Sequence, residues 1–253
     1  MSDLVLLLDA GNTRLKWAVA SAAGMVDQGV VEYADLSSAA ATWRRYGIAR
    51  VVGCNVAGPQ VAADLAAAFA PLVPEWLRSS AEQGGLRSSY RQPAQLGSDR
   101  WAAMIGARAR CAGELIVVMA GTAMTVDAVT AEGAFLGGVI VPGFRLMRQA
   151  LAQGTAELGL PDGEVVAFPA STGEAIVNGA LAALAGAIEE MRRRLESAQG
   201  RPATVLISGG DAATIAPLLQ ARLAERLIPV DNLVLDGLYQ LAFPTTAGPE
   251  ILT

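Results

Sequence analysis

Near its amino terminus the chain reads LVLLLDAGNTRLKWAVA over residues 4–20. The apolar run that ends at Asp9 predicts a buried strand, and the residues from Leu15 onward predict a strand that returns beside it. The turn between them presents the Asp9 carboxylate, the backbone amides next to Gly11 and the Thr13 hydroxyl. Amides and hydroxyls donate to phosphate oxygens, and a carboxylate can hold Mg²⁺ directly or through water. The stretch therefore predicts either a phosphate-binding turn or an ordinary β-hairpin with Asp-Gly-Asn turn chemistry.

A second copy of this pattern occurs at residues 115–129, which read LIVVMAGTAMTVDAV. Each copy has an apolar strand, a turn containing Ala-Gly, a second apolar strand and a third apolar stretch after Gly24 or Gly133. Chance similarity between two glycine-turned strand pairs is the alternative explanation. If the copies are related, the chain consists of two similar α/β halves, residues 1–112 and 113–253, whose turns face a common cleft.

Composition restricts the class of protein. A chain of 253 residues with 53% hydrophobic and 17% charged residues is expected to fold around a sizeable core. A net charge of -5 and a pI near 4.9 argue against nucleic-acid binding. The two cysteines, Cys54 and Cys111, fit neither a disulfide framework nor a zinc site. The apolar runs are too short for a membrane span or a signal peptide, so a cytoplasmic protein is expected.

Candidate chemistry is limited because the chain has no histidine, so a general base must be Asp, Glu, Lys, Tyr or Cys. Lys16, close to the first turn, is the only lysine. Neither the P-loop pattern nor the dinucleotide-binding GxGxxG pattern is present. Asp99 and Arg100 follow Ser98, which we expect to cap a helix. Asp99 is then either a residue favoured by the helix dipole or a carboxylate base beside a cation that binds an acidic substrate.

Apolar spacing and turn residues predict the other elements. Helices are expected over residues 36–46, 59–70, 98–112, 172–199 and 233–243, strands over 25–33, 50–56, 76–80 and 203–208, and a loop over 84–96. We expect Ser171 to cap the long helix, with Glu174 in its first turn. The turn at residues 208–211, Ser-Gly-Gly-Asp, is a candidate nucleotide contact.

Taken in order, these segments resemble the type III pantothenate kinases, which belong to the acetate and sugar kinase, Hsp70 and actin superfamily. The motifs that carry the resemblance are Asp9-x-Gly-Asn-Thr-x-x-Lys16, Tyr90-x-x-Pro-x-x-Leu-Gly-Ser-Asp-Arg100, Gly121-Thr-Ala-x-Thr-x-Asp127, Gly137-Gly-x-Ile-x-Pro-Gly143, Thr155-Ala, Thr172 with Ala175-Ile176, and Gly209-Gly-Asp211. The resemblance implies an α/β fold of two ribonuclease H-like (actin-like ATPase) halves with a ligand cleft between them. It also implies ATP-dependent phosphorylation of pantothenate to 4′-phosphopantothenate, the first step of coenzyme A biosynthesis, in a homodimer without nucleic-acid or membrane partners.

The resemblance also implies roles for individual residues. The residues matched to ATP binding are Asp9, Ala10, Gly11, Asn12, Thr13, Arg14, Leu15, Lys16 and Thr122. Those matched to pantothenate binding are Tyr90, Gly97, Ser98, Asp99, Arg100 and Thr172. Asp99 is the implied proton acceptor, and Asp9 is the candidate Mg²⁺ ligand, directly or through water.

One position departs from the family pattern. The family usually has an acidic residue three before the Gly-Thr-Ala threonine, where it coordinates a monovalent cation, K⁺ or NH₄⁺, and here that residue is Met119. A thioether is a poor ligand for such hard cations, so Met119 puts this cation site in doubt. Two alternatives to the pantothenate kinase function follow. The chain could be a weakened relative with a nucleotide-dependent regulatory role, or a kinase of another small hydroxy acid.

Overall fold

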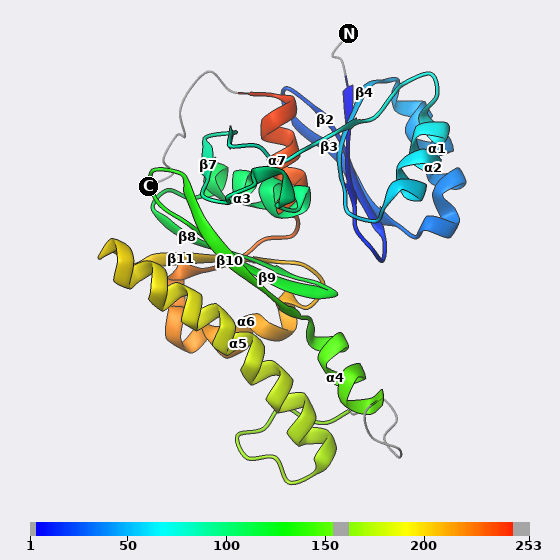
Figure 1. The fold of residues 1–253 in the computed structure, drawn as a ribbon. Coiled ribbons are helices and arrows are strands. Elements are labelled where there is room, and N and C mark those ends of the chain that lie inside the picture. Colours follow the sequence, from blue (N-terminus) through cyan, green and yellow to red (C-terminus); the bar gives the residue numbers. More distant parts are fainter. Residues whose placement is uncertain (1–3, 154–161, 245–253) are drawn as a thin grey trace. The chain divides into compact units, whose positions relative to one another are not determined.

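The computed structural model describes residues 4–153 and 162–244 (Figure 1). The chain divides into two compact units. Unit 1 comprises Met1–Ala112 and Asn232–Thr253, and unit 2 comprises Gly113–Asp231. Among the described residues, no helix is both long and apolar enough to cross a bilayer.

Unit 1 contains a five-stranded sheet with the order β3-β2-β1-β4-β5. Its strands are β1 (Leu4–Ala10), β2 (Leu15–Ser21), β3 (Gly24–Val31), β4 (Ile48–Asn55) and β5 (Glu75–Trp76). The first three strands form an antiparallel meander, whereas β4 runs parallel to β1 and β5 runs parallel to β4. Because β1 is central and buried on both faces, it is a nearly continuous apolar run, as its sequence indicated.

Helices cover both faces of this sheet (Figure 1). On one face, α1 (Leu36–Trp43) and α2 (Pro59–Phe69) contribute Trp43 and Phe69 to a core that contains Leu6 and Leu8 of β1. On the other, α3 (Ser98–Arg110) and α7 (Leu233–Ala242) pack against β1 and β4. Since successive strand residues point to opposite faces, Asp9 points toward the face covered by α3 and α7.

Short elements connect these parts of unit 1. They are the 3₁₀ helices η1 (Tyr33–Asp35), η2 (Arg44–Tyr46) and η3 (Pro93–Gln95), and the strands β6 (Glu82–Gln83) and β7 (Leu86–Ser88). The expectation of a plain loop over residues 84–96 is therefore wrong, because β7 pairs with β6 and η3 follows. The strand expected over residues 76–80 is only the two-residue β5, Glu75–Trp76.

The last helix, α7, packs closely on α3 through glycine. A Cβ on Gly237 would lie 1.9 Å from the Ala102 carbonyl oxygen, and one on Gly106 would lie 2.3 Å from the Leu233 carbonyl oxygen. Arg110 on α3 and Asp236 on α7 add an ion pair of 2.6 Å. The last helix thus belongs to unit 1, whereas the sequence analysis assigned all of residues 113–253 to the second half.

Unit 2 repeats the topology of unit 1, with strands in the order β12-β11-β8-β9-β10. They are β8 (Glu114–Ala120), β9 (Ala123–Val129), β10 (Ala134–Pro142), β11 (Ala203–Ser208) and β12 (Leu227–Pro229). Again three antiparallel strands are followed by two strands parallel to the first. The two β-hairpin copies seen in the sequence are therefore confirmed as the corresponding first hairpins of two similar sheets.

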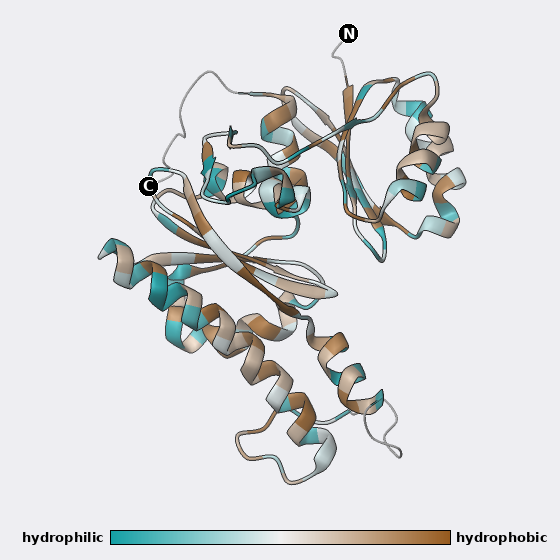
Figure 2. Cartoon of the chain, viewed as in Figure 1, coloured by the Kyte–Doolittle hydropathy of each residue, from teal (hydrophilic) through white to brown (hydrophobic). Residues whose placement is uncertain are grey.

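One face of the second sheet is covered by α5 (Thr172–Gln199) and α6 (Ala212–Leu223) (Figure 1). Leu184 and Ile188 of α5 lie in one core with Ile116, Val118 and Met124 of the sheet. The last turns of α5 are hydrophilic (Figure 2), and there Arg and Glu side chains form ion pairs along the helix. The remaining elements of this unit are α4 (Phe144–Gln153) and η4 (Ala224–Arg226).

Candidate active site

Three polar side chains lie next to one another at the end of the unit 1 sheet. The register of β1 and β2 places Asp9 opposite Lys16, and that of β1 and β4 places Asp9 beside Cys54. Asp9 is only 8% exposed, and its burial raises its pKa to about 6, against the lowering effect of the Lys16 charge. The negative charge of Asp99 contributes a smaller part of this increase in the Asp9 pKa. A desolvated carboxylate of this kind is stabilised by a bound cation, which fits the expected Mg²⁺ ligand.

Cys54 connects this row to the start of α3. Its thiol donates to the carbonyl oxygen of Ser98 at 3.2 Å. Burial raises the pKa of the Cys54 thiol well above its ordinary value, and the charges of Asp9 and Asp99 act in the same direction. Cys54 therefore stays a neutral thiol, and it is a positioning contact for the segment that carries Asp99.

The start of α3 is shaped by glycine. Gly97 occupies the N-cap position and Ser98 is the first helical residue, so the expectation that Ser98 caps this helix is wrong. The Asp99 carboxylate accepts a hydrogen bond from the Arg100 backbone N–H at 2.8 Å. A Cβ on Gly97 would lie 2.6 Å from an Asp99 carboxylate oxygen, so a side chain there would displace the carboxylate. Asp99 thus lies at the positive end of the helix dipole.

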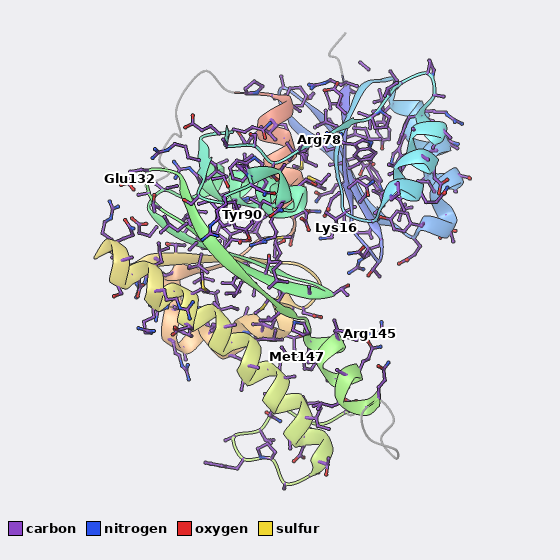
Figure 3. The ribbon with its side chains drawn as sticks, viewed as in Figure 1. Lys16, Arg78, Tyr90, Glu132, Arg145 and Met147 are labelled. Atoms are coloured by element: carbon purple, nitrogen blue, oxygen red, sulfur yellow. The ribbon has the colours of Figure 1, made fainter. Side chains whose placement is uncertain are left out.

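Arg100 is a buried cation beside this carboxylate. It is 5% exposed, and its guanidinium donates to the Tyr90 hydroxyl oxygen at 3.3 Å. Tyr90 and Lys16 are both labelled in Figure 3, Tyr90 in the segment before α3 and Lys16 on β2. The Ser79 hydroxyl, also buried, donates to the Gly97 carbonyl oxygen at 3.5 Å. A fixed guanidinium suits an anionic ligand such as a carboxylate.

The structure thus brings many of the predicted site residues together within unit 1. Asp9, Lys16, Tyr90 and residues 97–100 surround the end of β1 and the start of α3, and the charges of Asp9 and Asp99 interact. Within the first turn, residues 12–14 are exposed and available to a ligand. Ala10 and Leu15 are fully buried in the core, so only their backbone can reach a ligand.

The second turn, in unit 2, is held by close backbone contacts. The N–H of Gly143 donates to the Thr122 carbonyl oxygen at 2.9 Å, and the N–H of Asp211 donates to the Ala120 carbonyl oxygen at 3.0 Å. A Cβ on Gly143 would lie 2.0 Å from the Gly121 carbonyl oxygen. The Gly-rich segments before α4 and α6 therefore enclose the Gly121-Thr122 turn from two sides.

Met119 stands near this turn, on the sheet face away from the α5 core. It lies directly opposite Thr125, whose hydroxyl oxygen is buried without a hydrogen-bond partner in the described structure. Within residues 4–153 and 162–244, no group of three or more His, Cys, Asp or Glu side chains is placed to hold a metal ion. The side chains at this pair of facing positions are thus a thioether and an alcohol.

Thr172, the remaining predicted substrate contact, begins α5 in unit 2 and is exposed. The expected cap is confirmed, since the Ser171 hydroxyl accepts from the Glu174 N–H at 3.2 Å and the Glu174 carboxylate accepts from the Ala170 N–H at 2.7 Å. The Thr155-Ala motif lies outside the described residues.

Sequence reasoning missed Tyr33, Ser79 and the contact role of Cys54. The Tyr33 hydroxyl donates to the Gly11 carbonyl oxygen at 2.5 Å, which ties the first turn to η1. No motif marks these residues. For Cys54, the available signal was its place near the end of the strand expected over residues 50–56.

The chain is similar to known proteins over most of its length. A family model described as type III pantothenate kinase matches residues 5–194. Among curated proteins, the type III pantothenate kinase of Chromobacterium violaceum is 50% identical over 238 residues, covering 94% of this chain and 98% of the relative. That of Aromatoleum aromaticum is 46% identical over 242 residues, with the same coverage of 94% and 98%.

Solved structures share the fold at low identity. A Campylobacter jejuni protein described as a Baf family transcriptional activator aligns with a TM-score of 0.63 and 19% identity, over 93% of this chain and 96% of that one. A Sinorhizobium meliloti protein described as a 2-dehydro-3-deoxygalactonokinase aligns with a TM-score of 0.56 and 13% identity, over 95% and 100%. The expected α/β fold with two ribonuclease H-like units is confirmed. By its family match and its close relatives, the chain belongs to the type III pantothenate kinase family and is a phosphotransferase.

Proposed function

We propose that this protein transfers the γ-phosphoryl group of ATP to the primary hydroxyl of pantothenate, forming 4′-phosphopantothenate for coenzyme A biosynthesis. The observation that carries this proposal is the grouping of Asp9, Asp99 and the buried Arg100 around the end of β1 in unit 1. Phosphoryl transfer requires charge neutralisation, positioning and an oriented hydroxyl nucleophile, and these residues offer a group for each need.

Asp99 is the proposed base. As the pantothenate oxygen bonds to the γ-phosphorus and the bond to the ADP oxygen breaks, the hydroxyl proton moves to the Asp99 carboxylate. Its hydrogen bond from the Arg100 N–H holds the carboxylate in place in the first turn of α3. Gly97 leaves the space in which the carboxylate lies.

We propose that the two glycine turns bind the phosphates of ATP, one turn in each unit. A Cβ on Gly11 would approach only the Arg14 carbonyl oxygen, at 3.4 Å, and one on Gly121 only the Ala123 carbonyl oxygen, at 3.6 Å. The fold therefore leaves both positions open to a close ligand. In the first turn, residues 9–16 would contact the phosphates, and in the second turn Thr122 would. The buried Asp9 carboxylate would hold Mg²⁺, directly or through water, and the metal would neutralise phosphate charge.

Arg100, with Tyr90 as its hydrogen-bond partner, is the proposed site for the pantothenate carboxylate. Gly97 and Ser98 would contribute backbone contacts, and Thr172 is the proposed contact from unit 2. Because residue 119 is Met and not an acidic residue, we propose that the reaction rate depends little on K⁺ or NH₄⁺.

A cytoplasmic homodimer is part of the proposal. Large apolar side chains are exposed on β10, on α4 and on the segment before α5. They are Leu136, Ile140, Leu146, Leu151, Val165, Val166 and Phe168. Exposed large apolar side chains in this number favour an interface with a second copy of the chain.

A coupled ADP-release assay tests the reaction. Pantothenate should support turnover with Mg-ATP, while a panel of sugars and other hydroxy acids should not. Turnover only with a different hydroxy acid would favour a kinase of another substrate. Nucleotide binding without turnover of any acceptor would favour the regulatory alternative.

A further inference from the structure

The side chain of Tyr33, which lies outside the first turn, is hydrogen-bonded to the backbone of that turn within unit 1. It is the first residue of η1, directly after the meander, and its hydroxyl donates to the Gly11 carbonyl oxygen at 2.5 Å. The side chain is half-buried. The bond joins residues 22 positions apart, so it constrains the turn in a way that local hairpin geometry does not.

The bond determines which way one peptide group faces. The peptide between Gly11 and Asn12 is planar and trans, so its C=O and its N–H point in opposite directions. While Tyr33 binds the carbonyl oxygen, the Asn12 N–H points away from Tyr33. If the peptide turned over, a carbonyl oxygen would face the phosphates where an amide hydrogen is needed.

The electrostatic setting keeps Tyr33 a donor. Burial and the nearby Asp9 charge raise the pKa of Tyr33 to about 12. The hydroxyl therefore stays protonated over the pH range in which the protein would work. Asp9 itself lies at the end of β1, and the Gly11 N–H donates to the Asp9 carbonyl oxygen at 3.2 Å.

We propose that Tyr33 is a positioning residue that holds the Gly11-Asn12 peptide with its N–H directed at the phosphates of bound ATP. This inference rests on the proposed function, since it assigns a role within the proposed ATP site. The role is specific to one substrate, because Tyr33 supports the phosphate turn and not the Arg100 side of the site.

Tyr33→Phe removes the donor and keeps the ring. Tyr46→Phe is the matched control, because the Tyr46 hydroxyl also donates to a group in unit 1, the Asp27 carboxylate, away from the turn. We expect Tyr33→Phe to raise the KM for ATP about tenfold, the size expected for one hydrogen bond, and to leave the KM for pantothenate unchanged. Tyr46→Phe should change neither KM value.

Equal increases in both KM values for Tyr33→Phe would indicate general loosening and would overturn the inference, as would unchanged kinetics. A parent protein that neither bound ATP nor phosphorylated pantothenate would overturn the proposed function as well, so the two failures are distinguishable.

A measurement on the unmutated protein keeps the test valid if Tyr33→Phe folds poorly. With asparagine labelled by ¹⁵N, the Asn12 amide proton should shift strongly downfield on addition of a non-hydrolysable Mg-ATP analogue, and little on addition of adenosine. The resonance is assigned by its loss in Asn12→Gln. The absence of a phosphate-dependent shift would contradict the proposed direction of the Asn12 N–H.

Discussion

The turn between β1 and β2 and the turn between β8 and β9 occupy the same place in two similar sheets, but they are supported differently. The first is bordered by Asp9 and Lys16, and the Tyr33 side chain binds its backbone. The second has Met119 at its entry, and the backbones of Gly143 and Asp211 bind it. Two copies of one hairpin have thus separated into a charged turn, whose facing strand residues are Asp9 and Lys16, and a neutral turn, whose facing strand residues are Met119 and Thr125.

The glycines show what each turn needs. A Cβ would be tolerated at Gly11 and at Gly121, whereas at Gly143 and Gly209 it would come within 2.0 Å and 2.3 Å of a backbone oxygen of the second turn. The fold therefore has room for a side chain at the glycines inside the turns, and we propose that a ligand is what requires glycine there. The glycines that pack against the second turn are required by the fold. This difference between the turns predicts that charged side chains determine the chemistry at the first turn. At the second turn, it predicts that the backbone shape held by the packed glycines determines ligand binding.

The largest effect is expected from Asp99→Asn, at the start of α3, whose charge interacts with Asp9 of the charged turn. The amide cannot accept the hydroxyl proton, and a base of this kind contributes roughly 10²–10⁴-fold to the rate. We expect kcat to fall by that order while ATP binding, measured by calorimetry, is retained. Asp236→Asn is the control, because Asp236 also lies in the first turn of a unit 1 helix but pairs with Arg110. A rate for Asp99→Asn within a few-fold of the parent would show that another group is the base.

Substitutions around the neutral turn should mainly change the unfolding free energy of the protein. Gly143→Ala forces a Cβ against the Gly121 carbonyl oxygen, and overpacking of this kind costs on the order of 3 kcal/mol of unfolding free energy. Gly121→Ala should change the unfolding free energy by under about 1 kcal/mol and should instead raise the KM for ATP. Urea denaturation and steady-state kinetics on both variants measure this contrast. Equal stability of the two variants would break the proposed division between ligand-required and fold-required glycines.

Much of this arrangement can be predicted from sequence, because apolar runs and Ala-Gly turns are local signals. The strands, both turns and the long α5 follow from them. The contacts that complete the site are non-local. Cys54 comes beside Asp9 only through the parallel register of β1 and β4, and Tyr33 reaches Gly11 only through the path taken after β3. The packing of α7 on α3 depends on two helix-interior glycines, Gly106 and Gly237, whose meaning appears only once the helices are placed together.

Asp9→Asn tests whether the charge of the first turn weakens the fold. The pKa of Asp9 is about 6 in the folded chain against 3.8 ordinarily, so between these values the folded state binds more protons than the unfolded state. Stability from this group is present at low pH and is lost as the pH rises from about 4 to about 6. Two pKa units correspond to about 3 kcal/mol, an upper limit for the gain in Asp9→Asn. Urea denaturation from pH 4 to pH 8 should show this gain growing as the pH rises from about 4 to about 6 and staying constant at higher pH. Parallel pH profiles for variant and parent would contradict a buried, costly carboxylate.

The smallest effect is expected at Met119, where the sequence of the neutral turn departs from the family pattern described in the sequence analysis. Potassium and ammonium prefer carboxylate or carbonyl oxygens, and a thioether offers them little. Met119 instead fills the position as an apolar side chain opposite the buried Thr125 hydroxyl, which has no hydrogen-bond partner in the described part of the chain. Met119→Asp would supply both a cation ligand and an acceptor for that hydroxyl. We therefore expect the parent rate to depend little on added potassium. The rate of Met119→Asp should rise a few-fold with potassium and then saturate.

Initial rates are measured against potassium chloride at fixed ionic strength, balanced with a choline salt. Met119→Leu is the control, because it keeps an apolar side chain and should remain insensitive to potassium. Strong saturable activation of the parent would mean that other oxygens complete a cation site, and that the second turn is less neutral than its side chains indicate.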